Sequence, residues 1–202
     1  MNKDRPELIL ASTSAIRAQL LRAAGVEFTA LAPRVDEETI AAALLADAAP
    51  PRDIADALAE AKARKLSGQH PNAYVLGCDQ VLDLDGQMFS KPGSPDTATA
   101  QLHRLQGKTH HLYAAAVLYQ GGQPIWRHIG HARMTMRPLS AQRITDYVAQ
   151  NWDQIRHCVG CYQIEQAGVQ LFSAIEGDTF TIQGLPLIAL LNYFALRGLI
   201  AT

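Results

Sequence analysis

Short apolar runs alternate with segments of helical periodicity along most of this chain, and this alternation limits the fold more than any other feature. Strand-like runs cover residues 7–11, 26–31, 73–78, 110–119 and 125–136. Helical patterns cover residues 15–24, 39–48, 54–66, 95–105, 140–149 and 186–196. Such alternation predicts an α/β fold with a mixed sheet.

Two shorter patterns complete the prediction. Residues 81–88 read as a hairpin that turns at Asp85-Gly86, a favoured two-residue turn. Residues 169–174 and 179–182 are predicted to pair as strands on either side of Glu176-Gly177-Asp178. With 202 residues, no repeat and no long linker, residues 1–202 are expected to form a single domain.

The bulk composition excludes several classes of function. The chain carries 18 Lys plus Arg against 19 Asp plus Glu, which argues against nucleic acid as a partner because such binding needs a basic surface. No apolar run is long enough to span a membrane, and residues 1–6 lack the apolar segment of a signal peptide. Three Cys, an odd number, suit a reducing cytoplasm better than a disulfide framework.

The first apolar run stops at a cluster of hydroxyl groups. Ser12, Thr13 and Ser14 stand between the predicted strand and the following helix, and Arg17 lies about one turn into that helix. A helix N-terminus presents free N–H groups and a positive dipole, which favour anions. Residues 8–21 alone are compatible with a plain serine cap or with a phosphate site, and a cap is the commoner case.

A second group of polar residues follows the strand at 73–78. Asp79 comes where an α/β sheet tends to present ligand groups, and the hairpin can return Lys91 to its neighbourhood. A turn-forming role explains Asp79 equally well, and the hairpin turn itself explains Asp83 and Asp85.

Charged residues between these two segments can also be interpreted in terms of structure or of function. Asp36-Glu37-Glu38 is either a charge pattern at a helix start or a set of carboxylates for a divalent cation. Lys62, within the Ala-rich segment LAEAKARK, is by pattern a solvent-facing residue.

Cys158 and Cys161 have redox or zinc spacing, but the chain has no second Cys pair, so structural roles are favoured. His110 and His111 are predicted on opposite faces of one strand, as are His128 and His131, and neither pair makes a metal site by itself.

The order of these segments resembles the Maf family of nucleoside triphosphate pyrophosphatases, also described as septum formation inhibitors. The similarity runs over about residues 7–198 and is carried by LASTSAIRAQLL, VDE, LAEAKA, GCDQVLDLDGQMFSKP, LHRLQGKTHHLY and IEGDTFTIQGLPLIAL. It implies a mixed, elongated, twisted sheet flanked by helices, with two lobes around a cleft, related to the inosine triphosphatase fold. It also implies hydrolysis of a nucleoside triphosphate to the monophosphate and pyrophosphate, and it allows a homodimer.

Matched to the motifs of that family, the sequence supplies a complete set of site residues. Ser12, Ser14 and Arg17 fall on its first phosphate-binding segment, and Asp79 falls on its general base. Glu37, Lys62 and Lys91 fall on its acidic and lysine positions, and these three with Asp79 form the expected catalytic group. Glu37 and Asp79 are the expected ligands of a divalent Mg²⁺ or Mn²⁺ ion, since hard cations prefer carboxylate oxygens.

Three positions associated with base choice align with Ile16, Gln80 and Glu165. Gln80 and Glu165 resemble the residues of the branch that acts on 7-methyl-GTP. A carboxylate such as that of Glu165 suits this base, because it can accept both hydrogens of the guanine edge. Ile16 departs from that branch, which commonly has a stacking Trp there. Another purine, or a dTTP/UTP-type pyrimidine preference, therefore remains an alternative.

Two rival readings belong to other classes of protein. One is a nucleotide-binding regulator of cell division that needs no catalysis, although the intact acids and cations argue against it. The other is a redox or zinc protein built on Cys158 and Cys161.

Overall fold

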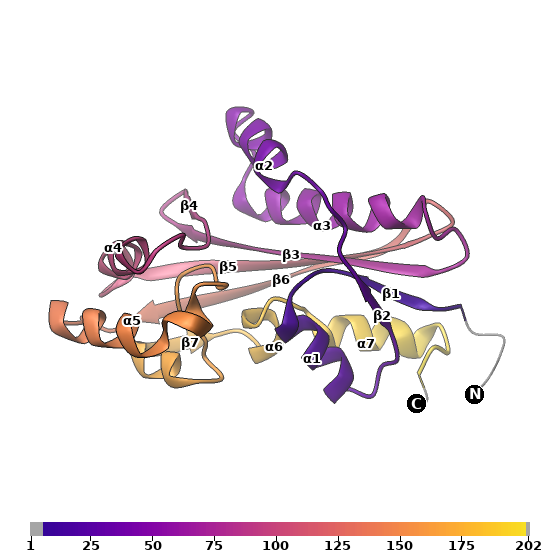
Figure 1. The fold of residues 1–202 in the computed structure, drawn as a ribbon. Helices are drawn as coiled ribbons and strands as arrows, with labels where there is room; N and C mark the ends of the chain where they lie inside the picture. Colours follow the sequence, from indigo (N-terminus) through magenta and orange to yellow (C-terminus); the bar gives the residue numbers. More distant parts are fainter. Residues whose placement is uncertain (1–5, 201–202) are drawn as a thin grey trace.

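The computed structural model describes residues 6–200, and within them the strands form one mixed, seven-stranded sheet (Figure 1). The expectation about a signal segment concerns mainly residues 1–5, which lie outside the described residues. The strands are β1 (Leu8–Ala11), β2 (Thr29–Leu31), β3 (Tyr74–Leu84), β4 (Gln87–Phe89), β5 (Thr109–Gln120), β6 (Gln123–Met136) and β7 (Phe172–Glu176).

The strand order is β2-β1-β3-β5-β6-β7, with β4 pairing on β3 as a hairpin. β1 runs parallel to both β2 and β3, whereas every other pairing is antiparallel. The predicted α/β class with a mixed sheet is therefore confirmed.

Helices flank this sheet, and several of them begin at a residue whose side chain caps the helix. They are α1 (Ala15–Ala23), α2 (Glu37–Ala46), α3 (Pro51–Ser67), α4 (Pro95–Leu105), α5 (Ala141–Ile155), the 3-10 turn η1 (Ala167–Leu171), α6 (Thr179–Ile182) and α7 (Leu187–Leu196). Ser14, Ser94 and Ser140 cap α1, α4 and α5 by accepting a backbone N–H with the hydroxyl oxygen. No helix in residues 6–200 is long and apolar enough to cross a membrane.

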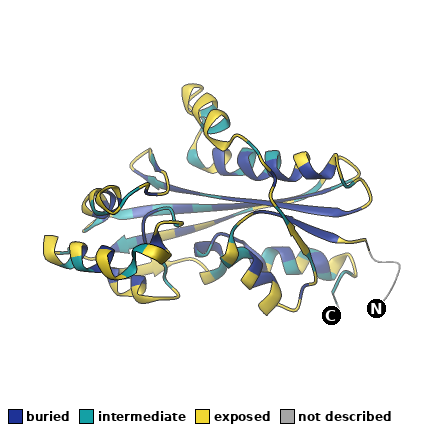
Figure 2. Cartoon of the chain, viewed as in Figure 1, coloured by how far each residue is buried: buried dark blue, intermediate teal, exposed yellow. Residues whose placement is uncertain are grey.

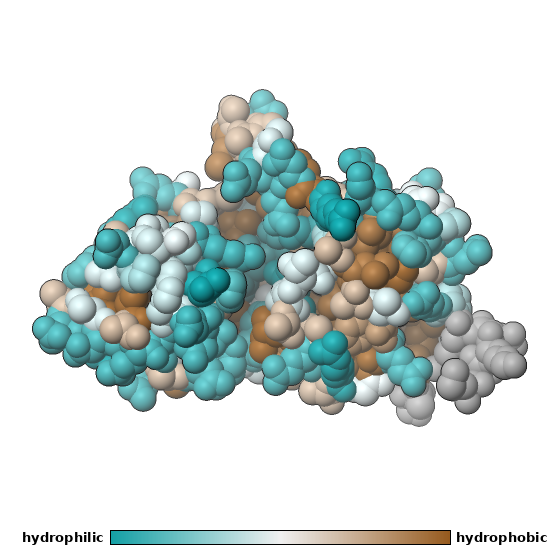
Figure 3. Space-filling view, in the orientation of Figure 1, coloured by the Kyte–Doolittle hydropathy of each residue, from teal (hydrophilic) through white to brown (hydrophobic). Residues whose placement is uncertain are grey.

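Two helical layers enclose one end of the sheet, and a separate group of elements covers the other end. α3 lies on one face, and α1 and α7 lie on the opposite face (Figure 1). At the far end, α4 and α5 pack with the ends of β3, β5 and β6 around their own buried cluster. The core is thus divided between two lobes, and the surface is hollowed between them below α2 (Figure 3).

α2 differs from the other long helices because it buries no residue completely (Figure 2). It projects from the face that α3 covers and rests on it through half-buried Ile40 and Leu44. Its first residue, Glu37, nevertheless pairs with the buried ammonium of Lys62, as described below.

Two sequence predictions were wrong. Residues 179–182 form α6 rather than a strand, because Asp178 caps the segment by accepting the Thr181 N–H at 2.9 Å. The strand predicted to end at Cys78 continues as β3 to Leu84, since β5 pairs with it as far as Asp83. In addition, the strand predicted at residues 26–31 is shorter than expected, since only Thr29–Leu31 pair, as β2.

A close contact at Gly77 sets the distance between α3 and the sheet. A Cβ atom at this position would lie 2.1 Å from the Ala59 carbonyl oxygen and 2.7 Å from the Ala63 nitrogen. Both neighbours are backbone atoms of α3, so neither can move alone. The absence of a side chain at Gly77 therefore allows α3 to lie directly on β3.

Gly77→Ala should lower the free energy of unfolding by about 2 kcal/mol or more, because overpacking against backbone forces α3 off the sheet. Chemical denaturation followed by circular dichroism measures this change. Gly68→Ala is the matched control, since a Cβ there meets no atom closer than 3.8 Å. Equal stability of the two variants would contradict the proposed role of this contact.

Candidate active site

The predicted phosphate segment and the predicted base meet at the carboxyl end of β1. β1 ends at Ala11, opposite Gly77, whereas β3 continues past this point. Asp79 and Gln80 therefore lie just beyond the end of β1, beside Ser12. In open α/β sheets, ligands bind outside the carboxyl ends of strands, and strand ends of this kind supply the polar groups.

At the end of β1, Lys62 forms ion pairs with two acids, Asp79 and Glu37. Its ammonium lies 2.6 Å from Asp79 Oδ1 and 2.9 Å from Glu37 Oε2. The Lys62 and Asp79 side chains are only 6% and 11% exposed, whereas that of Glu37 is 47% exposed. The pattern-based reading of Lys62 as solvent-facing was wrong, because α3 turns this residue toward β3.

Burial and charge act in opposite directions on Asp79. Desolvation raises the pKa of this carboxyl above its ordinary value, while the nearby charges of Lys62 and Arg17 lower it. Desolvation is the larger effect. A buried carboxylate of this kind is a better proton acceptor than an exposed one, and it stays paired with cations that can also contact a substrate.

The neighbouring acids Asp36 and Glu37 have different roles. Asp36 caps α2 by accepting the Thr39 N–H at 3.0 Å, and this hydrogen bond lowers the pKa of its carboxyl. Because the cap fixes the start of α2, Glu37 is presented on the first turn toward Lys62. Asp36 thus has the helix-start role that the sequence allowed, and Glu37 is the acid that pairs with Lys62.

Arg17 is held in place by backbone carbonyl groups. Its Nε donates to the Gly184 carbonyl at 2.7 Å, and its Nη1 donates to the Cys78 carbonyl at 2.9 Å. In the described chain its Nη2 has no hydrogen-bond partner. The guanidinium is thus oriented by the fold and keeps two N–H groups for an anion.

The serines beside Arg17 organise the turn into α1. Ser14 Oγ caps the helix by accepting the Arg17 backbone N–H at 3.4 Å. Ser12 is buried, and its Oγ accepts the Ser14 N–H at 3.2 Å and Arg17 Nη1 at 3.4 Å. The cap predicted from the sequence is present, and it stands next to the oriented guanidinium.

Gln80 is fixed by α6, which the sequence analysis had missed as a helix. Its Nε2 donates to the carbonyl oxygens of Thr181 and Ile182 at 3.1 and 2.9 Å. Because Nε2 is committed as a donor, the group that remains for a further partner is the acceptor Oε1.

α6 itself is seated against Gly130 of β6. A Cβ at Gly130 would lie 2.3 Å from Thr181 Oγ1, so only glycine leaves room for this buried threonine. The hydroxyl of Thr181 in turn donates to Asp178. Gly130, Thr181 and Gly184 therefore support the site. From the sequence, Gly130 was placed in a strand and the other two in a family-like segment, but none of them was given a role in the site.

Two of the three remaining predicted residues, Lys91 and Glu165, lie toward the far lobe. Lys91 and Glu165 are both exposed, and no ion pair within the described residues joins Lys91 to Asp79. Both charges act on the half-buried Cys158 thiol, where Lys91 lowers and Glu165 raises its pKa, while burial raises it most. Ile16 is half-buried on the first turn of α1. The structure therefore brings Lys91 and Glu165 to one neighbourhood, around Cys158.

Comparison with known proteins assigns the family. The family model described as "Maf-like protein" matches residues 7–196. The chain belongs to the Maf-like protein family. The matched segment contains every site residue described above.

Curated relatives of this Maf-like chain are named as pyrophosphatases. The "Nucleoside triphosphate pyrophosphatase" of Ruegeria pomeroyi is 62% identical over 195 residues, which is 96% of this chain and 98% of that protein. That of Roseobacter denitrificans is 56% identical, over 95% of this chain and 96% of the relative. The "7-methyl-GTP pyrophosphatase" of Brucella abortus is 46% identical, over 92% of this chain and 93% of the relative.

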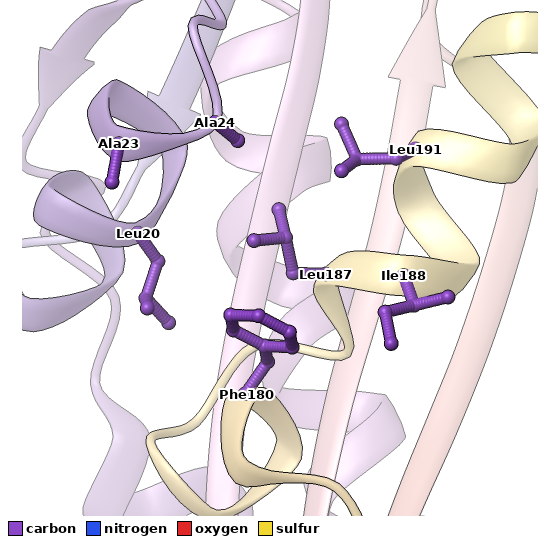
Figure 4. A pocket seen from close by; sticks show the side chains of 7 residues that line it. All are labelled: Leu20, Ala23, Ala24, Phe180, Leu187, Ile188 and Leu191. Carbon is purple, nitrogen blue, oxygen red and sulfur yellow. The ribbon is translucent and has the colours of Figure 1, made fainter. Parts of the chain in front are cut away.

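Two other features of the chain lie apart from this site. An apolar pocket of about 210 Å³ lies between α1 and α7, where Leu20, Phe180 and Leu191 face one another (Figure 4). Its lining side chains carry no polar group, so it offers nothing to a phosphate. Cys158 and Cys161 are free thiols, and the Cys161 thiol donates to Gln101 Oε1 at 3.0 Å.

Lys62→Met should lower the free energy of unfolding by about 3 kcal/mol, because it leaves the Asp79 carboxylate buried without its cation. Removing the cation also raises the pKa of Asp79 further. The unfolded chain then releases this proton first, so the stability of the variant falls as the pH rises above about 4, until folded Asp79 ionises.

Denaturant titration at several pH values measures both effects. Lys65→Met, an exposed lysine on the same helix, is the matched control. If Lys62→Met is no less stable than Lys65→Met, the buried ion pair does not have the role described.

Proposed function

We propose that this chain hydrolyses a nucleoside triphosphate to the monophosphate and pyrophosphate. The observation that carries the proposal is the buried Lys62 ammonium held between Asp79 and Glu37, beside the oriented guanidinium of Arg17. Curated relatives at 46–62% identity are named for this activity, which supports it.

Phosphate binding is assigned to the end of β1. A triphosphate carries about four negative charges at neutral pH, and its attack by water needs cations that are in place beforehand. Nη2 of Arg17 and the ammonium of Lys62 supply two of them, and the first N–H groups of α1 add donors beside Ser12 and Ser14.

Asp79 is the proposed general base. A water molecule attacks the α-phosphorus, the bond to the bridging oxygen of the β-phosphate breaks, and pyrophosphate leaves with the electron pair. Asp79 accepts the proton that the water loses, and its buried position raises the pKa that makes this acceptance favourable. Lys62 orients the carboxylate through Oδ1 and leaves Oδ2 for the water.

The acids at the site also fit a divalent cation. Glu37 and Asp79 reach the same ammonium, so their carboxylates converge, and oxygen ligands suit Mg²⁺ or Mn²⁺. Within residues 6–200 no cluster of three or more such side chains is arranged to hold an ion, so phosphate and water would complete the shell. When bound, the ion would neutralise phosphate charge and acidify the attacking water.

The residues proposed to contact the nucleotide base favour a base whose edge carries hydrogen-bond donors. Glu165 accepts hydrogen bonds only, and Gln80 presents its Oε1 acceptor because Nε2 is held by α6. Guanine offers adjacent N–H groups, so a guanine nucleotide, including 7-methyl-GTP, is the proposed substrate class. Ile16 gives apolar contact instead of ring stacking, which predicts a weaker preference for the methylated, cationic base.

Lys91 is proposed to contact the substrate from the far lobe, since its exposed ammonium lies on the same side as Glu165. A cytoplasmic location and a homodimer are proposed with the activity. The three reduced thiols support the first of these, because a reducing compartment keeps cysteines free.

Asp79→Asn should lower turnover about 100-fold or more, because the amide cannot accept the proton. The assay is a panel of nucleotides, including 7-methyl-GTP, with Mg²⁺ or Mn²⁺, in which pyrophosphate and orthophosphate are measured separately. Asp85→Asn, in the exposed turn between β3 and β4, makes the same chemical change and should keep full activity.

Three outcomes would contradict the proposal. Full activity of Asp79→Asn would exclude this residue as the base. Release of orthophosphate alone would exclude attack at the α-phosphorus. Tight nucleotide binding without turnover would favour the alternative of a non-catalytic regulator.

Glu165→Gln should lower the ratio of guanine to pyrimidine turnover by about tenfold or more, because an amide replaces one acceptor of the base edge with a donor. The same nucleotide panel, analysed as kcat/KM for each base, measures this ratio. Glu176→Gln is the matched control, since this exposed acid on β7 pairs with Arg133. An unchanged ranking of bases would exclude Glu165 as the base reader.

A further inference from the structure

Two histidines meet on the face of the sheet beyond the end of α3. His111 of β5 and His131 of β6 place Nδ1 and Nε2 only 2.9 Å apart, with their ring planes 20° from parallel. The sequence analysis paired each of these residues with a neighbour on its own strand, and strand alternation excluded both pairs. The cross-strand pair arises because β5 and β6 are antiparallel with Tyr113 opposite His131.

The two imidazoles are suited to bind a metal ion. A single hydrogen bond between two ring nitrogens needs one donor and one acceptor, so at least one ring is neutral. The neutral form of imidazole is the one that coordinates a metal ion. His131 is exposed and His111 is half-buried, so both rings can reorient toward an ion that arrives from solvent.

An acid on the next strand adds negative charge to this cluster. Asp83 of β3 stands directly opposite His111, so the strand order places His111 between Asp83 and His131. One carboxylate oxygen of Asp83, Oδ1, is buried without a hydrogen-bond partner. The Asp83 charge also reaches Tyr113, whose ring lies 4.9 Å from that of His131. This unpartnered acceptor, next to His111, leaves a place for an ion or for a water molecule bound to one.

We propose that His111 and His131 form a binding site for a divalent transition metal ion of the Zn²⁺ or Cu²⁺ type, with Asp83 as the neighbouring acid. Imidazole nitrogen suits these ions, whereas Mg²⁺ prefers oxygen, so the site differs in chemistry from the carboxylates of the catalytic group. Since no three His, Cys, Asp or Glu side chains in the described chain are grouped to hold an ion, two nitrogens are the protein ligands and water completes the shell.

Such an ion would cross-link the start of β5 to the last part of β6. These strand ends carry the lobe in which α4 and α5 pack, and Glu176 of β7 pairs with Arg133 two residues from His131. An ion that binds only the folded state raises the free energy of unfolding by an amount that grows with the logarithm of its concentration divided by its Kd. The site is therefore expected to stabilise the lobe that contains Glu165, independently of the nucleotide.

The test measures Zn²⁺ binding to the untagged, metal-free chain by competition with a chromogenic chelator. Wild type should bind one more equivalent than His131→Gln or His111→Gln, or bind that equivalent at least about tenfold more tightly. Zn²⁺ should raise the Tm of wild type more than that of either variant. His128→Gln, an exposed histidine on the same strand that stacks on Trp126, is the matched control and should behave as wild type.

A Cu²⁺ complex gives a second readout, because two coordinated imidazoles produce a characteristic nitrogen coupling in electron paramagnetic resonance. Loss of that coupling in His131→Gln, with retention in His128→Gln, would support the site. Equal Zn²⁺ binding by wild type and both pair variants would overturn it, as would equal loss in the His128→Gln control. Neither result depends on pyrophosphatase activity, so failure here is distinguishable from failure of the proposed function.

Discussion

The buried ammonium of Lys62 is the interaction on which the rest of the site depends. It carries one positive charge between two carboxylates, in a place where an unpaired charge would be strongly unfavourable. Its position follows from Gly77, since only a glycine on β3 lets α3 approach closely enough for Lys62 to reach Asp79. The same approach buries Asp79, so packing and electrostatics have one geometric cause.

The site combines elements from both faces of the sheet because β1 is short. α3 contributes Lys62 from one face and α1 contributes Arg17 from the other, and they meet where β1 stops and β3 continues. A longer β1 would pair with this part of β3 and separate the two cations. The termination of one strand at Ala11 thus creates the gap in which the charged groups meet.

The polar residues of the candidate site could be predicted from the sequence, but the burial and hydrogen-bond partners of some of them could not. Ser12, Ser14 and Arg17 were predictable because a helix start is a local feature. Lys62 was not, because its burial is decided by Asp79, seventeen residues away on another element. The acceptors of Arg17 Nε and Nη1 are backbone carbonyls, which leave no signal in a sequence.

The length of an element decided whether it could be predicted, so the outline of the sheet was predictable and α6 was not. Long strands such as β5 and β6 carry enough alternation to be recognised, and a Gly-Gly turn joins them. The four residues Thr179–Ile182 are too few to show a period, and β-branched residues suggested a strand. The cap by Asp178 and the space above Gly130 decide their conformation instead.

One consequence of α6 concerns how proteins of this architecture can diversify. The carbonyls of Thr181 and Ile182 hold Gln80, and the carbonyl that closes this segment, at Gly184, holds Arg17. The short segment from Thr181 to Gly184 thus holds both Gln80, the proposed base-side residue, and Arg17, the proposed phosphate-side residue. Under the proposed function, a substitution that shifts this segment would change base selectivity and turnover together.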